Sequence, residues 1–379
     1  MTDSMRAVSD ICATITKKVD RAYVAECGIK GEIPEKLWRM WADTGLLGMG
    51  IPEEYGGSGG GVSEIVLAND LLHQAGLEMH AAPNQMSRTT IVKHGTAAQK
   101  QKYLPPTVSG KTVFAFSITE PDAGTNTFKI RTNAKRRGGA YILNGQKHFC
   151  TGFRESDFVL VVTRTAAADP ANRTSGLSLF VVDTKAKGLS STEMNVAIYF
   201  PGKHYVVNFD DVEVPAENLI GPEGRGLEAM FDCLNSERLI TAGKAVGMAD
   251  HVLGRAVEYA KIRAPFDTPI GAYQSIQHPM AAAKAKIEAA RLMIYAAAAL
   301  YDRGGKAGLA ANRVKYLSSD AFKAAADIAA TTFGGAALDL DNDIIPFYLR
   351  AKLQEVAPVN NLAVLGFIGQ QELGLPKSY

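Results

Sequence analysis

Glu237 is the residue of this chain best placed by type and surroundings to do chemistry. It lies in MFDCLNSERLITAGKAVGM, a segment whose apolar spacing predicts a helix. The residues three and four positions away are all uncharged: Cys233, Leu234, Ile240 and Thr241. Ion pairing along the helix therefore does not explain the carboxylate. A carboxylate removed from water has a raised pKa and can act as a general base, although the helix alone equally allows a solvated or structural role.

Two polar segments in the middle of the chain could hold a flat, acceptor-rich ligand. SITEPDAGTN (117–126) ends a β-rich run and combines a proline, a glycine and free hydroxyls, which favours a loop with accessible N–H groups. In NGQKHFCTG (144–152), Asn144–Gly145 predicts a hairpin turn, and Phe149 and Thr151 follow two residues apart. On a regular strand these two share a face, which suits ring stacking with a hydroxyl donor beside it. A plain strand connection and a core aromatic with a surface threonine remain alternatives.

Other common kinds of catalytic or binding site are not indicated. The seven histidines show no HExxH spacing, and the four cysteines show no CxxC or Cys/His spacing, so no metal site is expected. There is no GxSxG nucleophile elbow, no GxGxxG after a strand and no GxxxxGK[ST]. A triad hydrolase, a Rossmann site and a P-loop are therefore not predicted.

Composition restricts the class of protein further. The chain has 379 residues, 46% of them hydrophobic, and a formal net charge of +2, so it can bury a large core and is not expected to bind nucleic acid. No 18-residue uncharged apolar run predicts a membrane span, and the first residues do not resemble a signal peptide. With few cysteines, a cytoplasmic location is expected.

Three regions of different character must position these residues. Residues 1–112 show helical spacing, residues 113–220 contain short runs rich in β-branched and aromatic residues, and residues 221–379 are again helical and rich in alanine. We therefore expect a mainly α protein with a central antiparallel β sandwich or barrel and a C-terminal domain like a four-helix bundle. The proline pair 105–106 is expected to end one helix, and a single last helix is expected over about 347–369.

Eight segments, in order, resemble the acyl-CoA dehydrogenase family over essentially the whole chain. They are WADTGLLGMGIPEEYGG (41–57), HGTAAQKQKYLPPTVSGK (94–111), SITEPDAGT (117–125), YILNGQKHFCTG (141–152), VNFDDVEVPAENLIGPEGRG (207–226), SERLITAGKAVGMADH (236–251), RAPFDTPIGAYQSIQ (263–277) and TTFGG (331–335). Each is weak alone, but their shared order indicates homology. The resemblance implies bound FAD, an acyl-CoA substrate and an electron-transferring flavoprotein as acceptor.

Carried over by position, five residues of the middle region look like the contacts of the flavin ring. Phe116, Ile118 and Thr119 resemble the ring loop, Phe149 resembles the stacking aromatic, and Thr151 resembles the donor to flavin N5.

Further positions resemble contacts to the rest of the ligands. Thr125 and Arg238 resemble residues near the CoA portion of the substrate. Gly334–Gly335 matches a turn beside the FAD pyrophosphate, although Thr331 stands where the family usually has glutamine, which weakens one expected contact.

The resemblance also implies a homo-oligomer, either a tetramer or a dimer. Arg263, Phe266 and Gln274 resemble the stretch that reaches the FAD of a neighbouring subunit.

The chain departs from the family near its C-terminus. Many members carry a catalytic glutamate followed by Gly-Thr, but Pro358, Val359 and Asn360 occupy those positions here, and Glu355 is about one turn away. A subset of the family places its base on the helix before the Arg-x-x-Phe segment, and Glu237 matches that position. The resemblance thus implies that Glu237 takes the α-proton in the dehydrogenation of an acyl-CoA to a 2-enoyl-CoA.

Two other functions remain open from the sequence. A flavin monooxygenase or oxidase on the same fold would explain the lost C-terminal glutamate but not Glu237. A non-catalytic subunit that holds FAD or CoA would need neither base.

Overall fold

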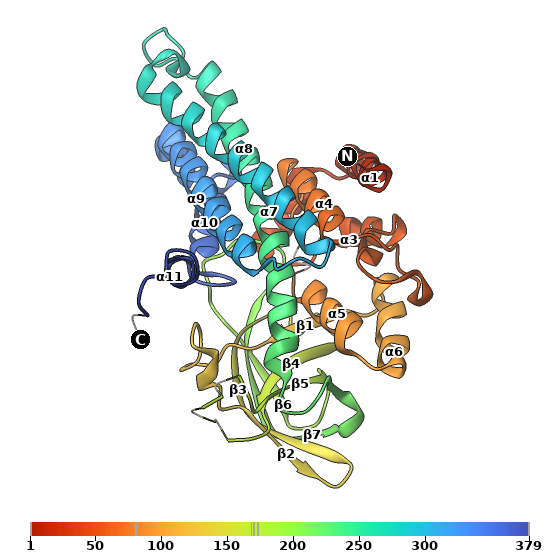
Figure 1. The fold of residues 1–379 in the computed structure, drawn as a ribbon. Coiled ribbons are helices and arrows are strands. Elements are labelled where there is room, and N and C mark those ends of the chain that lie inside the picture. The colour runs from red at the N-terminus through yellow and green to blue at the C-terminus, as the bar shows by residue number, and fades with distance from the viewer. Residues whose placement is uncertain (1, 80–81, 168, 170, 173, 378–379) are drawn as a thin grey trace.

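Helices form the first and last parts of the chain and strands the middle, as Figure 1 shows. The structure is a computed structural model that describes residues 2–79, 82–167, 169, 171–172 and 174–377. The α-helices are α1 (Asp3–Lys18), α2 (Arg21–Lys30), α3 (Glu35–Asp43), α4 (Val62–Gln74), α5 (Ala82–His94), α6 (Ala97–Val108), α7 (Gly226–Ile262), α8 (Gln274–Asp302), α9 (Gly308–Phe333), α10 (Ile345–Val356) and α11 (Asn361–Gln371). The strands are β1 (Phe114–Ser117), β2 (Asn133–Arg137), β3 (Ala140–Thr151), β4 (Phe158–Arg164), β5 (Leu177–Asp183), β6 (Leu189–Glu193), β7 (His204–Pro215) and β8 (Leu219–Ile220). Short 3₁₀ turns are η1 (Leu46–Gly48), η2 (Glu53–Tyr55), η3 (Thr127–Lys129), η4 (Ala216–Asn218), η5 (Ile270–Ala272), η6 (Gly334–Leu338) and η7 (Leu340–Asn342).

The N-terminal helices begin and end largely where local chemistry dictates. Thr2 and Asp20 cap α1 and α2 through their side-chain oxygens, and Thr96 with Gln99 forms a capping box at α6. The prediction that Pro105–Pro106 ends a helix was wrong, because α6 continues to Val108. The two prolines lack N–H donors, but they stand near the end of the helix, where few backbone bonds are lost. Their carbonyl oxygens accept hydrogen bonds from the N–H groups of residues 109, 111 and 112.

The strands form one eight-stranded sheet with the path β6-β7-β3-β2-β4-β5-β8, and β1 pairs with β4. Most pairs are antiparallel, as predicted, but β1 and β2 each run parallel to β4. The predicted turn at Asn144–Gly145 was wrong: both residues lie inside β3, and the hairpin between β2 and β3 turns at residues 138–139. Gly145 is required by close approach, since a Cβ there would lie 2.5 Å from Thr132 Oγ1.

Helix α7 connects the sheet with the helical bundle. Its first residues follow the sheet, and the rest runs through the bundle beside α4, α8 and α9 (Figure 1). Two glycines allow α7 to pack closely on α4. A Cβ at Gly243 would lie 3.0 Å from the carbonyl oxygen of Val66, and one at Gly247 would lie 2.5 Å from that of Asp70. Their shared side of α7 is therefore committed to helix packing.

The single helix expected over 347–369 is two helices in the structure. Helix α10 ends at Val356 and α11 begins at Asn361, with Pro358 in the linker. Proline disfavours a helical conformation of the residue before it, and Asn360 caps the new helix by accepting from the Leu362 N–H.

Among the described residues, no helix combines the length and apolar character that a bilayer crossing requires. The same part of the chain contains no cluster of three or more His, Cys, Asp or Glu side chains that could hold a metal ion.

Candidate active site

Glu237 lies in the first third of α7 as a partly buried carboxylate without a hydrogen-bonding partner among the described residues. Its Oε2 atom is fully buried and has no partner within the described residues. Burial raises the pKa of Glu237 to about 7, although the charges of Arg238 and Lys244 act in the opposite direction. The sequence left open whether this side chain was solvated. The structure shows that at least its Oε2 atom is withdrawn from solvent, and a carboxylate of this pKa can accept a proton near neutral pH.

One helical turn before Glu237, α7 contributes to the same apolar core as the segment expected to hold the flavin ring. Cys233 belongs to the same buried apolar cluster as Phe116, and Leu234 and Ile118 pack against that cluster from its edge. Tertiary packing thus places the helical turn before Glu237 and part of the predicted ring loop around one core.

Arg238 and Lys315 supply positive charge on the α9 side of α7. Arg238 is buried, donates from Nη1 to Asn235 Oδ1 over 2.9 Å, and leaves Nε without a partner among the described residues. Burial, and then the charge of Arg238, lower the pKa of Lys315 to about 8. Lys315 donates to Asn361 Oδ1 over 2.5 Å, so the start of α11 lies beside this cationic pair.

The linker between α10 and α11 contains the position at which many family members carry their catalytic glutamate. Pro358 lies there, and Glu355 is engaged elsewhere: it pairs with Lys352 at 2.7 Å and Lys323 at 3.1 Å. These lysines hold the pKa of Glu355 below its ordinary value, chiefly through the hydrogen bond from Lys352. Glu355 is therefore a poor candidate for the base.

Phe149 and Thr151 form a polar and aromatic wall at the end of β3. Phe149 has a positive φ of 54°, uncommon for an aromatic residue, and its side chain is 54% exposed. Strain of this kind, kept with an exposed ring, is typical of ligand contacts. The simple alternation of a regular strand does not apply here, because the β3–β7 register shifts between Lys147 and Cys150.

His204 completes this wall and was missed by sequence reasoning. Its Nδ1 lies 2.8 Å from Thr151 Oγ1, and its ring centroid lies 6.2 Å from that of Phe149. Burial lowers the pKa of His204 to about 4, so the imidazole is neutral at physiological pH. No spacing signal could have found it, because His204 follows Thr151 by 53 residues and meets it only through the β3–β7 pairing.

A buried ion pair fixes the loop that carries Ile118 and Thr119. Lys147 donates to the carbonyl oxygen of Ile118 over 2.9 Å and to Glu120 over 2.8 Å. Glu120 also accepts from the backbone N–H groups of residues 131 and 132, and Thr119 accepts from the N–H of residue 148. Burial alone would raise the pKa of Glu120, but Lys147 and these hydrogen bonds bring it below its ordinary value. The loop is therefore held by hydrogen bonds within the chain itself.

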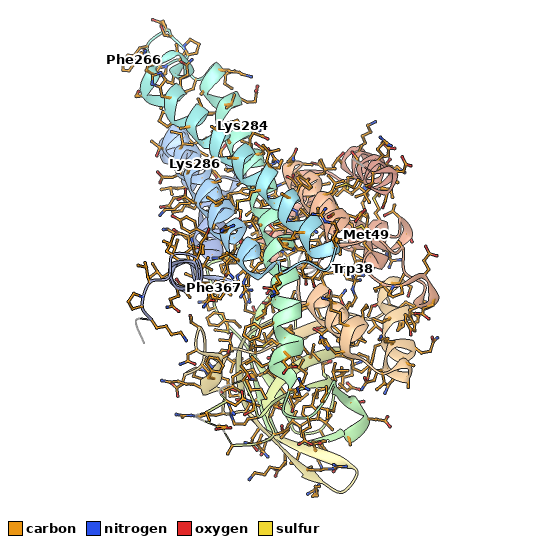
Figure 2. The ribbon with its side chains drawn as sticks, in the orientation of Figure 1. Trp38, Met49, Phe266, Lys284, Lys286 and Phe367 are labelled. Atoms are coloured by element: carbon orange, nitrogen blue, oxygen red, sulfur yellow. The ribbon has the colours of Figure 1, made fainter. Side chains whose placement is uncertain are left out.

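The remaining predicted residues are not part of this cluster. Thr125 lies on the exposed turn after Glu120. Six further residues are exposed near the opposite end of the bundle: Arg263, Phe266, Gln274, Thr331, Gly334 and Gly335. Phe266 is 81% exposed, and Figure 2 shows it at the end of the bundle remote from the sheet.

Helix packing shows how far Glu237 lies from the exposed residues at the end of the bundle. Helix α9 begins close to Asn235, since a Cβ at Gly308 would lie 4.0 Å from Asn235 Oδ1. It ends where Phe333 stacks on Tyr259 with ring centroids 4.1 Å apart. Tyr259 follows Glu237 by 22 residues, about 33 Å along the helix axis. Gly334 and Arg263 are therefore at the other end of α7 from Glu237.

Comparison with known proteins identifies the family. The N-terminal, middle and C-terminal domains of acyl-CoA dehydrogenase match residues 2–111, 115–212 and 224–357. The chain belongs to the acyl-CoA dehydrogenase family. A relative within it is acyl-CoA dehydrogenase FadE12 of Mycobacterium tuberculosis (strain ATCC 25618 / H37Rv), which is 38% identical over 382 residues, covering 100% of this chain and 98% of the relative.

Solved structures of related proteins have the same fold as this chain. Butyryl-CoA dehydrogenase from Megasphaera elsdenii is 29% identical, with a TM-score of 0.90 over 98% of this chain and 99% of that one. The FAD complex of PigA is 26% identical, with a TM-score of 0.89 over 99% and 98%. The predicted fold class, mainly α with a central β domain, is confirmed.

FAD is the cofactor of this protein, as predicted. The residues present fit such a group: the exposed Phe149 ring offers a flat surface, and the buried hydroxyl of Thr151 lies beside it. The main chain of Ile118 and Thr119 is fixed next to the same strand.

Proposed function

We propose that this protein dehydrogenates an acyl-CoA thioester between its α and β carbons, with Glu237 as the base that takes the α-proton. The observation that carries the proposal is the state of Glu237: partly buried, without a hydrogen-bonding partner among the described residues, and with a pKa raised to about 7. A structural carboxylate in such a place would be expected to have a partner.

The side chains around the site have distinct roles in this reaction. Glu237, partly deprotonated at neutral pH, receives the proton from the α-carbon, and its buried setting keeps water from competing for it. Bound FAD supplies the acceptor for the hydride that leaves the β-carbon. Thr151, held by His204, offers its hydroxyl to the ring, and Phe149 supports the face of that ring. Thr125 and Arg238 are proposed to contact the CoA-bearing part of the substrate.

We further propose a homo-oligomer in which Arg263, Phe266 and Gln274, with Thr331 and Gly334–Gly335, contact the FAD of a neighbouring subunit. The separation of about 33 Å along α7 supports it, because one FAD at the Phe149 wall cannot also reach the end of the same bundle. The outer face of α8 supports it too, since Leu292 is 75% exposed. Exposed alanines continue that face: Ala281, Ala282, Ala285, Ala289 and Ala296.

The units 1–112, 113–220 and 221–379 are proposed as the domains of the chain, and the order of helices and strands supports them. The proposed electron acceptor, an electron-transferring flavoprotein, rests on the family resemblance. A reducing compartment such as the cytoplasm is supported by the four cysteines, which are buried and form no disulfide bonds.

Anaerobic mixing of the FAD-loaded protein with acyl-CoAs of graded length and branching tests the reaction. We expect bleaching of the flavin absorbance with formation of the 2-enoyl-CoA. Bleaching only by reduced flavin or nicotinamide would point to a monooxygenase. Failure of the purified chain to retain FAD or to respond to any acyl-CoA would point to a binding subunit.

A further inference from the structure

Glu237 is the first of three polar residues that follow one face of α7. Thr241 and Lys244 come four and seven residues later, and both are only 8% exposed. Lys244 follows Glu237 by seven residues, which is about 20° short of two full helical turns and about 10 Å along the helix axis. The two side chains therefore lie on the same face of α7. Lys244 borders the side on which Gly247 packs against α4, and its charge, after burial, lowers the pKa of His73 there.

Lys244 lacks a hydrogen-bond acceptor in the described part of the chain. The carboxylates that act on its charge are Glu78 and Glu237. Glu78 is already ion-paired with Arg350, which also donates to the carbonyl oxygen of Tyr199. Two buried cations thus share Glu78. Burial lowers the pKa of Lys244, in keeping with an ammonium group that has lost water without gaining a full set of partners.

This arrangement limits what can lie beside Glu237. In the proposed reaction the α-carbon of the acyl group sits at Glu237, so an extended acyl tail that follows this face into the bundle approaches Lys244. Methylene groups laid over the ammonium would strip its remaining hydration and offer no hydrogen bond in return. A short acyl group avoids that cost because it ends before Lys244.

We propose that Lys244 closes the acyl site and restricts this protein to acyl-CoA thioesters with a short acyl group. The inference rests on the proposed function of Glu237 and adds the substrate class. Lys244 acts here as a specificity-determining residue, since it lies about two turns from the carboxylate that receives the proton.

Steady-state kinetics with butyryl-CoA, octanoyl-CoA and lauroyl-CoA test the proposal. We expect wild type to show its highest kcat/KM with butyryl-CoA. Lys244→Ala should raise the octanoyl-to-butyryl ratio of kcat/KM at least tenfold, and Lys244→Met, which keeps much of the length but removes the charge, should raise it less. Lys261→Ala, at the exposed end of α7, is the matched control and should leave the ratio unchanged. A wild-type preference for lauroyl-CoA would overturn the proposal, as would ratios within twofold of wild type in both Lys244 variants.

A binding experiment separates this inference from the proposed function. S-butyl-CoA and S-octyl-CoA are thioethers that cannot be dehydrogenated, and calorimetry with FAD-loaded wild type and Lys244→Met measures their affinities without turnover. If no acyl-CoA reduces the flavin, the proposed reaction is wrong, but a preference for S-butyl-CoA that Lys244→Met weakens still supports a site closed by Lys244. Equal thioether preferences in the two proteins would refute that closure.

Discussion

Two regions of the molecule differ in burial. In the region of Glu237 on α7 and of Thr151 at the end of β3, polar groups are buried and hydrogen bonds within the chain hold the residues in place. At the C-terminal end of α7, the residues expected to contact FAD are exposed. Glu237, Thr151 and His204 belong to the first region, and Phe266 at 81% exposure belongs to the second. The first is organised within one chain. The second is exposed, and its Phe266 ring is an apolar group of the kind that another subunit could cover. If the proposed homo-oligomer forms, the difference means that a single chain builds the part of the site that holds Glu237 but not the whole FAD site.

Loss of the Glu237 carboxylate gives the largest expected effect and tests whether the chemistry belongs to the first region alone. We expect Glu237→Gln to lower turnover by at least about a thousandfold, because a positioned general base contributes on that scale. FAD content and assembly should be unchanged. Anaerobic stopped-flow measurement of flavin bleaching checks this. Glu355→Gln is the matched control, and near-normal turnover in Glu237→Gln would disprove the assignment.

Removal of Lys147 tests whether the wall is rigid because of its buried ion pair. Lys147→Met leaves Glu120 as a buried charge without its partner, which should lower the free energy of unfolding by about 3 kcal/mol. Urea denaturation of the FAD-loaded protein measures the loss. The exposed pair of Arg137 with Glu213 provides the control, since Arg137→Met should change stability by less than about 1 kcal/mol. Equal losses in the two variants would show that the buried pair does not hold the loop.

The pH dependence of the reaction should report Glu237. The base works deprotonated, so kcat/KM should rise about tenfold per pH unit below a pKa of about 7 and level off above it. This amounts to about fiftyfold between pH 5 and pH 7, because half of the carboxyl groups are still protonated at pH 7. A profile without this limb, measured with a substrate whose thioester does not titrate, would exclude Glu237 as the base.

The same titration predicts a change in stability. Because the pKa of Glu237 is raised in the folded state, the folded protein favours the neutral carboxyl, and stability falls as pH rises from about 4.5 through about 7. A rise from 4.5 to about 7 corresponds to about 3 kcal/mol. Glu237→Gln should therefore be more stable than wild type at pH 8 but not at pH 4, as thermal unfolding at the two pH values would show.

Phe266→Ala tests the second region. Covering an exposed phenylalanine contributes about 2 kcal/mol, so its loss should weaken FAD retention and subunit association at least about tenfold. Sedimentation velocity and FAD titration measure these changes. Phe128→Ala, which removes an exposed phenylalanine from the sheet region, serves as control. If both variants behave alike, the end of the bundle has no special role in holding FAD.

The smallest expected effect comes from His204. His204→Leu removes the hydrogen-bonding partner of Thr151. The loss of a hydrogen bond with a net contribution of about 1 kcal/mol should weaken FAD binding about fivefold. Fluorescence titration of the apoprotein measures this change. His148→Leu is the matched control, since His148 bonds to Gln146 and not to Thr151. If His148→Leu weakened FAD binding more than His204→Leu, the hydrogen bond between Thr151 and His204 would not be what supports FAD binding.

Local sequence patterns predicted the elements well where chemistry is local, and less well where tertiary contacts intervene. The order of helices and strands was correct, because apolar spacing and β-branched runs are local signals. Asn144–Gly145 was read as a turn from its composition, but Gly145 is needed because β3 passes close to Thr132. The last helix was read as continuous although Pro358 interrupts it.

The chain's own residues, together with the family resemblance, were enough to nominate Glu237, Phe149 and Thr151 and to predict FAD. Burial of Glu237 and its unpartnered oxygen arise from packing between α7 and distant segments, which no spacing reveals. His204 meets Thr151 through strand pairing, and Lys244 shares Glu78 with Arg350 across the bundle. Residue types and spacing thus determined which groups could do chemistry. Only the tertiary structure decided which of them lose water and partners, because desolvation depends on contacts between segments far apart in the sequence.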